Sequence, residues 1–201
     1  MPLFKNTVNV AFFGRAGVGK TSTINNLFNL NWKVAHGKAA TKELTKKVVE
    51  IETKDQVCKV LVIDTPGFAE STSVDYTSCH KEAAQMADCI FWLYQADVRY
   101  FSTDQKALLN IRPLVSERVS FFIGLNHVDL IHPQNWDSKA NMPSMEQREN
   151  ILLKSDIVLE RLKRYLPPQS VPVIPYSAKC KYNLELILEK IVSLKREAKN
   201  V

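Results

Sequence analysis

Eight consecutive residues, GRAGVGKT at positions 14–21, restrict what this chain can fold into more than any other part of its sequence. They match the pattern Gly-x-x-x-x-Gly-Lys-Ser/Thr and stand between an apolar run at 8–13 and a helix-like stretch at 21–30. Such a loop cradles phosphate when a buried strand delivers it, its glycines let backbone N–H groups turn inward, and the positive end of the next helix faces the anion. The phosphate contacts are expected from Gly14, Arg15, Ala16, Gly17, Val18, Gly19, Lys20, Thr21 and Ser22. The loop predicts nucleotide binding without saying which nucleotide.

Short apolar runs alternate with segments of helical period along the chain, a pattern typical of βαβ units. We expect strands at 8–13, 45–52, 57–63, 89–94, 119–125 and 171–174, and helices at 21–30, 77–87, 104–111, 146–165 and 182–197. Only residues 53–56 separate the second strand from the third, too few for a crossover helix, so these two strands should pair antiparallel. The sequence therefore predicts an α/β fold: a six-stranded mixed sheet with one antiparallel edge strand and helices on both faces.

The size and composition of the chain favour one domain over residues 1–201, since 45% of the residues are hydrophobic and can bury one substantial core. No apolar stretch approaches the roughly 20 residues that cross a bilayer, and the N-terminus lacks the layout of a signal peptide, so a cytoplasmic protein is expected. The net charge of +6 suits a partner such as RNA, although Lys and Arg are spread along the chain.

Two stretches stand out from this regular pattern. The segment at 131–145 is long for a connection inside a compact domain, so it should be either a binding loop or locally mobile. The four cysteines, Cys58, Cys79, Cys89 and Cys180, have no C-x-x-C spacing and are expected to be reduced and mostly buried.

Asp64-Thr65-Pro66-Gly67 stands at the end of the third expected strand. A carboxylate there can hold Mg²⁺ through a water molecule, and the Gly67 N–H can face a terminal phosphate. The same four residues are also an ordinary strand-to-turn sequence. The expected switch segments are 31–44, before the second strand, and 66–78, which begins inside this motif.

A threonine in the first of these segments can reach both Mg²⁺ and the γ-phosphate, so that triphosphate orders the segment and diphosphate releases it. Thr41 is the preferred candidate. Thr45 competes with it, but Thr45 already resembles the start of a strand. The expected metal ligands are therefore Thr21, Thr41 and Asp64.

Asn126-His127-Val128-Asp129 ends the fifth strand and matches Asn-Lys-x-Asp except at its second position. The carboxylate of Asp129 can accept two hydrogen bonds from the N1–H and exocyclic amine of guanine, which adenine does not offer in this arrangement. Alternatively, Asn126 and Asp129 only cap the turn.

Ser177-Ala178-Lys179 follows the last strand and precedes the last helix. There the backbone N–H of Ala178 could donate to the guanine O6, while Ser177 braces the loop. A three-residue match is weak by itself, and its position in the chain is what favours a role in reading the base.

These five motifs, taken in order, resemble the GTP-binding domain of the translation-factor-like GTPases, within them the Era-like group. The chain is also similar to the bacterial YeeP/YkfA/YfjP-type family of ribosome-binding GTPases. That second resemblance rests on Trp136-Asp137, Pro143-Ser144, Gln147, Asn150-Ile151 and Tyr182-Asn183-Leu184. Together the two resemblances imply a P-loop NTPase G domain that binds GTP or GDP with Mg²⁺ and acts as a GTPase switch. They also imply that Lys20, Thr41 and Gly67 take part in catalysis.

Several residues depart from the family pattern. His127 replaces the lysine whose stem packs along the ribose in relatives, so nucleotide affinity should be lower. Phe68 stands where Ras-like proteins place the glutamine that orients the attacking water, so intrinsic hydrolysis should be slow. Gly17 replaces an asparagine of the potassium-using members, which argues against stimulation by potassium. Arg15 and Arg99 are expected to be solvated surface charges rather than arginine fingers.

Two outputs remain open from the sequence. The GTP form could dock on the large ribosomal subunit through the basic surface, or the protein could pair across its nucleotide face as septin-like and immunity-associated GTPases do. A P-loop ATPase or kinase is disfavoured by Asp129 and the Ser177-Ala178-Lys179 loop.

Overall fold

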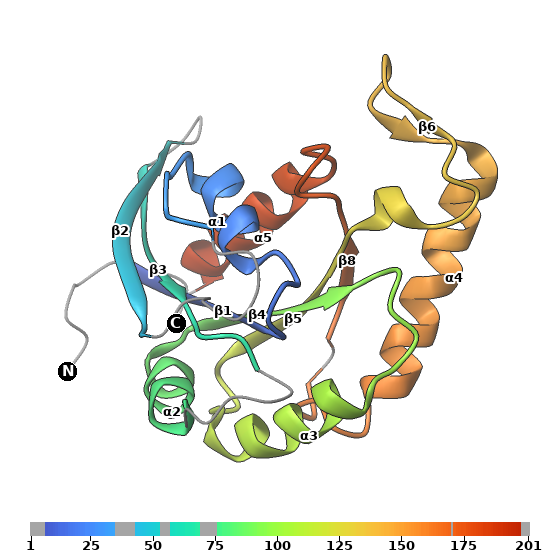
Figure 1. Ribbon diagram of the computed structural model, residues 1–201. Helices are drawn as coiled ribbons and strands as arrows, with labels where there is room; N and C mark the ends of the chain where they lie inside the picture. The colour runs from blue at the N-terminus through green and yellow to red at the C-terminus, as the bar shows by residue number, and fades with distance from the viewer. Residues whose placement is uncertain (1–6, 35–42, 53–56, 69–75, 170, 198–201) are drawn as a thin grey trace.

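The computed structural model of the chain describes residues 7–34, 43–52, 57–68, 76–169 and 171–197 (Figure 1). Its centre is a six-stranded sheet of order β2-β3-β1-β4-β5-β8. The strands are β1 (Thr7–Gly14), β2 (Thr45–Glu52), β3 (Val57–Asp64), β4 (Cys89–Gln95), β5 (Ser120–Asn126) and β8 (Val173–Pro175). Only the edge strand β2 pairs antiparallel in this sheet. The predicted fold class is confirmed.

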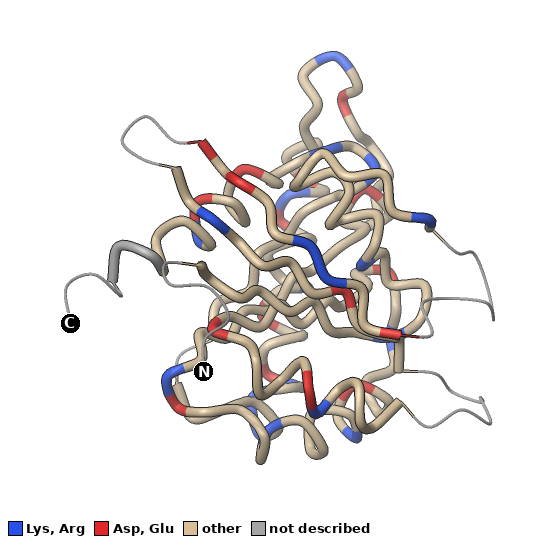
Figure 2. Tube along the Cα trace, turned by 90° about the vertical axis from the view of Figure 1, so that its left-hand side faces the viewer, with Lys and Arg blue, Asp and Glu red and all other residues tan. Residues whose placement is uncertain are grey.

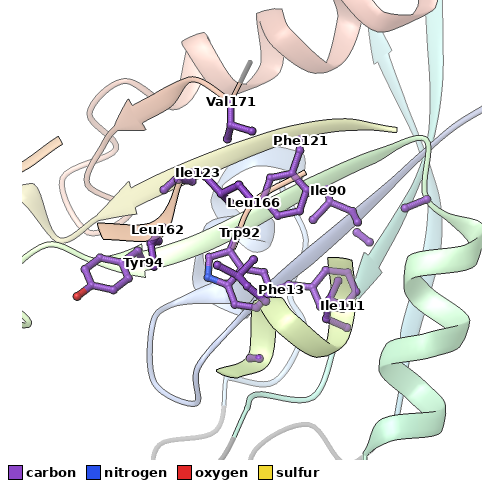
Figure 3. Close-up of a cluster of buried hydrophobic side chains, with 14 of the residues drawn as sticks. Phe13, Ile90, Trp92, Tyr94, Ile111, Phe121, Ile123, Leu162, Leu166 and Val171 are labelled. Atoms are coloured by element: carbon purple, nitrogen blue, oxygen red, sulfur yellow. The ribbon is translucent and has the colours of Figure 1, made fainter. Parts of the chain in front are cut away.

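The central strands carry apolar side chains on both faces of the sheet, as expected of buried parallel strands, and helices therefore cover both faces. On one face pack α1 (Lys20–Phe28) and α5 (Leu184–Glu197). On the other pack α2 (Thr77–Met86), α3 (Ser102–Ile111) and α4 (Met145–Leu162). Figure 3 shows this second layer, in which Phe13 of β1 and Trp92 of β4 lie beside Ile111 of α3.

The pairing register decides where the motifs meet. Within β1 and β3, Phe12 lies opposite Asp64, and within β4 and β5, Gln95 lies opposite Asn126. Since these strands are parallel, their carboxyl ends reach the same edge of the sheet, which is where open α/β sheets bind ligands. The phosphate loop, the Asp64 motif and the Asn126 motif therefore leave the sheet side by side.

The segment at 131–145, expected to be either a binding loop or locally mobile, has secondary structure of its own. After a short 3₁₀ turn (Val128–Leu130), it holds a two-stranded hairpin of β6 (Trp136–Asp137) and β7 (Met142–Pro143), which projects past the end of the sheet beside α4 (Figure 1). The sequence missed this hairpin because strands of two residues carry no readable alternation. Helix boundaries differ by up to three residues, which is common at helix ends.

The cysteines follow the prediction in part. Cys58 and Cys89 are buried in strands, Cys79 and Cys180 are half-buried, and all four are free thiols. None of the described helices combines the length and apolar character that crossing a bilayer requires.

A buried pair of hydroxyl groups joins α1 to the segment after β8. The Thr23 Oγ1 and Tyr176 Oη atoms are 2.9 Å apart, and both residues have no exposed surface. Burial raises the pKa of Tyr176, so the phenol stays protonated. We expect Tyr176→Phe to lower the free energy of unfolding by about 1–3 kcal/mol, because the Thr23 hydroxyl loses its partner. Urea unfolding measures this change.

The double variant Thr23→Val with Tyr176→Phe removes both hydroxyl groups and should recover most of the loss, because replacing both partners by apolar groups is nearly neutral. A double variant less stable than Tyr176→Phe alone would contradict this account of the contact.

Candidate nucleotide-binding site

The phosphate loop connects β1 to α1 at the carboxyl edge of the sheet. Gly19 has a φ of +92°, in the left-handed region that side chains disfavour, and a Cβ atom there would lie 2.5 Å from the Asn126 Nδ2 atom. Glycine is therefore required at this position by both backbone conformation and space. The helix α1 starts directly afterwards, at Lys20, so its unpaired N–H groups point into the loop.

Lys20 folds back over its own loop. Its Nζ atom donates to the carbonyl oxygens of Gly14 at 3.0 Å and Arg15 at 2.9 Å. Burial lowers the pKa of Lys20 to about 8, and the nearby Asp64 and Asp104 carboxylates oppose this shift. The ammonium group is thus held where an anion entering the loop would neutralise it.

Asp64 and Thr21 form an oxygen-rich pair at the side of the loop. The Thr21 Oγ1 donates to Asp64 Oδ2 at 2.6 Å, and Asp64 Oδ1 is buried without a hydrogen-bond partner among the described residues. Burial raises the pKa of Asp64, while the Thr21 hydrogen bond and the Lys20 charge lower it. An unpartnered carboxylate oxygen beside a hydroxyl fits a hydrated Mg²⁺ ion, which prefers oxygen ligands. The third predicted ligand, Thr41, lies outside the described residues.

Gly67 lies directly against the phosphate loop. A Cβ atom at Gly67 would be 2.6 Å from both the N and the Cα atoms of Ala16. The next residue bridges the loop as a strand would, since the Phe68 N–H donates to Gly14 O and the Ala16 N–H donates to Phe68 O, each at 3.2 Å. The Asp64 motif is therefore more than a turn after β3, because it packs along the loop that precedes Lys20.

The ring of Phe68 points into the core. It lies 4.2 Å from the His80 ring, 5.2 Å from the Trp92 ring and 6.3 Å from the Phe13 ring, measured between centroids. The His80 Nε2 atom is in turn 2.8 Å from the Pro66 carbonyl oxygen. This apolar packing keeps the side chain away from the loop, where a water-orienting group would have to lie.

Asn126 joins the phosphate loop to the loop after β8. Its Nδ2 donates to Val18 O and its Oδ1 accepts from the Ala178 N–H, both at 3.0 Å. Asn126 therefore links distant segments and does not merely cap its own turn. The Ala178 N–H, expected to donate to guanine O6, has Asn126 as a partner, so a base must share or displace this bond.

Asp129 faces the same loop. Its Oδ1 accepts from the Ser177 hydroxyl at 2.7 Å, which orients the carboxylate. His127, between Asn126 and Asp129, has a left-handed backbone with φ of 64°. Its Nε2 atom is buried without a partner among the described residues, 3.6 Å from where a Cβ of Gly19 would lie. The imidazole therefore lies against the phosphate loop, in the place of the lysine side chain of the family pattern.

A pocket of about 300 Å³ lies between these segments. Gly14, Arg15, Val18, Asp64, Asp129 and Ser177 are predicted site residues that do not line it. Asn26, Val34 and Thr65 line the pocket and were not among the predicted site residues. Asn26 donates to the Ala178 carbonyl oxygen at 2.9 Å. A polar residue on the pocket side of α1 was the only signal for it. The lining residues are Ala16, Gly17, Gly19, Lys20, Thr21, Ser22, Asn26, Val34, Thr65, Gly67, Asn126, His127, Ala178 and Lys179.

The prediction that Arg15 is a solvated surface charge is wrong. Its side chain is buried, its Nε atom lies 3.2 Å from Asp104 Oδ2, and its guanidinium carbon stands 4.7 Å from the centre of the Tyr100 ring. Asp104 also accepts from the Trp92 indole N–H at 3.1 Å. Burial raises the pKa of Asp104 to about 6, and both of these partners oppose the shift. The sequence could not reveal this contact because Asp104 lies on α3, far along the chain. Arg99 is exposed, as predicted.

We expect Arg15→Met to lower the free energy of unfolding by about 3 kcal/mol at pH 8, because it leaves a buried carboxylate without its countercharge. The loss should shrink toward pH 5. The pKa of Asp104 in the folded chain lies above its ordinary 3.8, so the carboxyl favours folding when protonated and loses that contribution as the pH rises through the folded pKa.

Urea unfolding at both pH values measures this effect, with Arg99→Met as the matched control because Arg99 is exposed. The control should change stability by less than about 0.5 kcal/mol. Equal, small effects of the two substitutions would show that the Arg15 contact has no energetic role.

Solved structures share this fold. The structure of Era from Aquifex aeolicus bound to GDP and AlF4⁻ superimposes with a TM-score of 0.70 at 21% identity, over 94% of this chain and 57% of that one. Era in complex with MgGDPNP and a segment of 16S ribosomal RNA gives the same TM-score and identity, over 95% and 57%. The predicted resemblance to the Era-like group is confirmed at the level of the fold.

Curated relatives come from several groups. Era of Halothermothrix orenii is 24% identical over 184 residues, which cover 90% of this chain and 53% of Era. The protein YkfA of Escherichia coli is 25% identical over 193 residues, covering 94% and 63%. Septin-5 of Macaca fascicularis is 27% identical over 190 residues, covering 86% and 47%. This chain thus spans about half to two thirds of the length of these relatives.

The family described as "50S ribosome-binding GTPase" matches residues 9–126. This range runs from β1 through the phosphate loop and the Asp64 motif to Asn126, so it contains three of the four segments that form the pocket. It also covers more than half of the 201 residues. The chain belongs to the 50S ribosome-binding GTPase family.

Proposed function

We propose that this protein binds GTP with Mg²⁺, hydrolyses it slowly to GDP and phosphate, and acts as a molecular switch. The observation that carries the proposal is the convergence of the phosphate loop, the Asp64 motif, the Asn126 motif and the Ala178 loop on one pocket. The first two would hold the phosphates and the last two the guanine base. A pocket of about 300 Å³ is of the size that small-ligand sites have.

Each phosphate-side residue has a role that its geometry supports. The ammonium group of Lys20 would contact the β- and γ-phosphates and offset their negative charge, and the Gly67 N–H would donate to the γ-phosphate. Thr21 would bind Mg²⁺ directly and Asp64 through water, with Thr41 completing the set in the triphosphate state. The ion, when bound, neutralises charge that develops on the phosphates during in-line attack by water.

The proposed slow turnover follows from the packing of Phe68. Its ring is committed to contacts with His80 and Trp92, so no side chain at this position orients water. The orientation of the water would then come from backbone groups or from a partner. The imidazole of His127 is shorter than the side chain of lysine, which supports a lower affinity for nucleotide. Gly17 has no side-chain oxygen that could bind a potassium ion.

Substituting Lys20→Ala should weaken GTP and GDP binding by at least about 100-fold, because the buried ammonium is the charge aimed at the phosphates. A titration with a fluorescent GDP analogue measures the affinity, and competition by ATP and GTP reports base selectivity. The exposed Lys106, on α3 and outside the pocket lining, provides a matched control, since Lys106→Ala should leave the affinity unchanged. Full affinity in Lys20→Ala would remove the assignment of the phosphate loop.

For the output of the switch, we favour GTP-dependent association with the large ribosomal subunit. Membership of the 50S ribosome-binding family and a net charge of +6 support it. The charge is not gathered in one place, however: in Figure 2 the Lys and Arg residues are interspersed with Asp and Glu. Recognition would therefore depend on local groups of charges rather than on a single basic face.

The alternative is a dimer that forms across the nucleotide face, and the similarity to septins supports it. A partner copy would then supply the group that orients water in place of Phe68. In both cases the nucleotide occupies the same pocket, so the two outputs differ in the partner and not in the site.

Sedimentation with a non-hydrolysable GTP analogue separates the two outputs. For the ribosome switch we expect a monomer that co-sediments with ribosomes only in the presence of GTP or its analogue, with an association that falls steeply as salt is raised. A nucleotide-dependent dimer without ribosome binding would favour the alternative, and GDP provides the control for both.

A further inference from the structure

We propose that the β6–β7 hairpin and the start of α4 act as a brace that sets guanine selectivity, by positioning Asp129 and the base loop, defined as residues 177–182. The brace consists of Trp136, Asn141 and Gln147. This inference rests on the proposed binding of guanine nucleotide, and it assigns positioning residues for the base that lie outside the five motifs.

Gln147 supports the backbone of Asp129 through hydrogen bonds from its side chain. Its side chain is fully buried, and its Nε2 donates to Ile131 O at 2.8 Å and to Asp129 O at 3.3 Å. Its Oε1 is buried without a partner among the described residues, which costs desolvation energy that an apolar side chain would avoid. The presence of glutamine here is therefore explained by its two donated hydrogen bonds and not by packing.

The hairpin holds the base loop from outside. The Trp136 indole N–H donates to Asn141 Oδ1 at 3.2 Å, and Asn141 Nδ2 donates to the Cys180 carbonyl at 2.9 Å. The Trp136 ring also packs edge-on against the Tyr182 ring, with 5.1 Å between centroids. Asn141 has a left-handed φ of 51°, a conformation that asparagine tolerates better than most residues.

The base loop transmits this support to the base-reading carboxylate. Ser177 and Tyr182 exchange two backbone hydrogen bonds, of 3.2 and 3.0 Å, which close the loop. The Ser177 hydroxyl accepts from the Cys180 N–H at 3.1 Å and donates to Asp129 Oδ1 at 2.7 Å. A shift of Cys180 therefore moves the hydroxyl that orients Asp129, and Asn141 holds Cys180 in place.

Selectivity depends on this orientation more than phosphate binding does. Both carboxylate oxygens of Asp129 must meet guanine together, one at N1–H and one at the 2-amino group, and hydrogen bonds weaken steeply when their angles are poor. The phosphates are gripped by a separate loop, whereas the brace bonds to the backbone of Asp129, Ile131 and Cys180. Loosening the brace should thus weaken the hold on guanine while leaving the hold on phosphate.

The test compares GDP with IDP, whose hypoxanthine base keeps N1–H and O6 but lacks the 2-amino group. The variant Asn141→Gly removes the amide and keeps the left-handed backbone accessible. We expect its dissociation constant to rise roughly 5- to 20-fold for GDP and less than about 3-fold for IDP, so that the preference for GDP falls. The exposed Lys139, on the same hairpin, supplies the control Lys139→Ala, which should leave both constants unchanged.

Two further variants locate the effect. Trp136→Phe keeps a ring against Tyr182 but loses the bond to Asn141, so it should give a smaller fall in the GDP preference. Asp129→Asn marks the limit, since it should move the preference toward xanthine nucleotides. An unchanged GDP-to-IDP ratio in Asn141→Gly, or an equal loss for both nucleotides, would overturn the brace. A wild-type protein that binds neither nucleotide would instead overturn the proposed function.

Discussion

The parallel pairing of β1 with β3 and β4, continued by β5 and β8, is the constraint on which the rest of the structure depends. It brings the carboxyl ends of five strands to one edge of the sheet. The phosphate loop follows the end of β1, and Asp64 and Asn126 are the last residues of β3 and β5. One hydrophobic layer on each face holds this arrangement in register, because a slip of any central strand would disrupt the close packing of its buried side chains. The pairing of the strands therefore sets the relative positions of the site residues.

Around the phosphate loop the structure tolerates an unusual concentration of buried charge. Lys20, Asp64 and the Arg15–Asp104 pair are all buried, and burial shifts the pKa values of Lys20, Asp64 and Asp104 toward their neutral forms. Such groups are rarely placed inside a protein for stability alone. Perturbed pKa values that cluster beside a pocket are typical of functional sites, where an incoming anion and cation complete the charge balance.

The phosphate side and the base side of the pocket are built separately and then joined by the side-chain amides of Asn126 and Asn26. The phosphate side rests on the sheet, whereas the base side rests on α4, the β6–β7 hairpin and the base loop. Asn126 bonds to Val18 on one side and to Ala178 on the other, so it links the two halves directly. This division explains how the base contacts can be tuned by residues far from the phosphates.

The sequence by itself determined the sheet, the order of its elements and the motif positions, because a glycine-rich loop after an apolar run, alternating periods and a short hairpin connection are local signals. The apolar character of Phe68 likewise agrees with the packing of its ring into the core. Only the tertiary structure decided that Arg15 is buried against Asp104 and that a hairpin occupies 131–145. It also decided that Gln147 supports the backbone of Asp129 and that Asn141 and Asn26 support the base loop. The hairpin was missed because its two-residue strands are too short to show a period. The other features depend on contacts between residues far apart in the chain, and a hydrogen bond or ion pair of that kind leaves no period, composition or spacing from which it could be read.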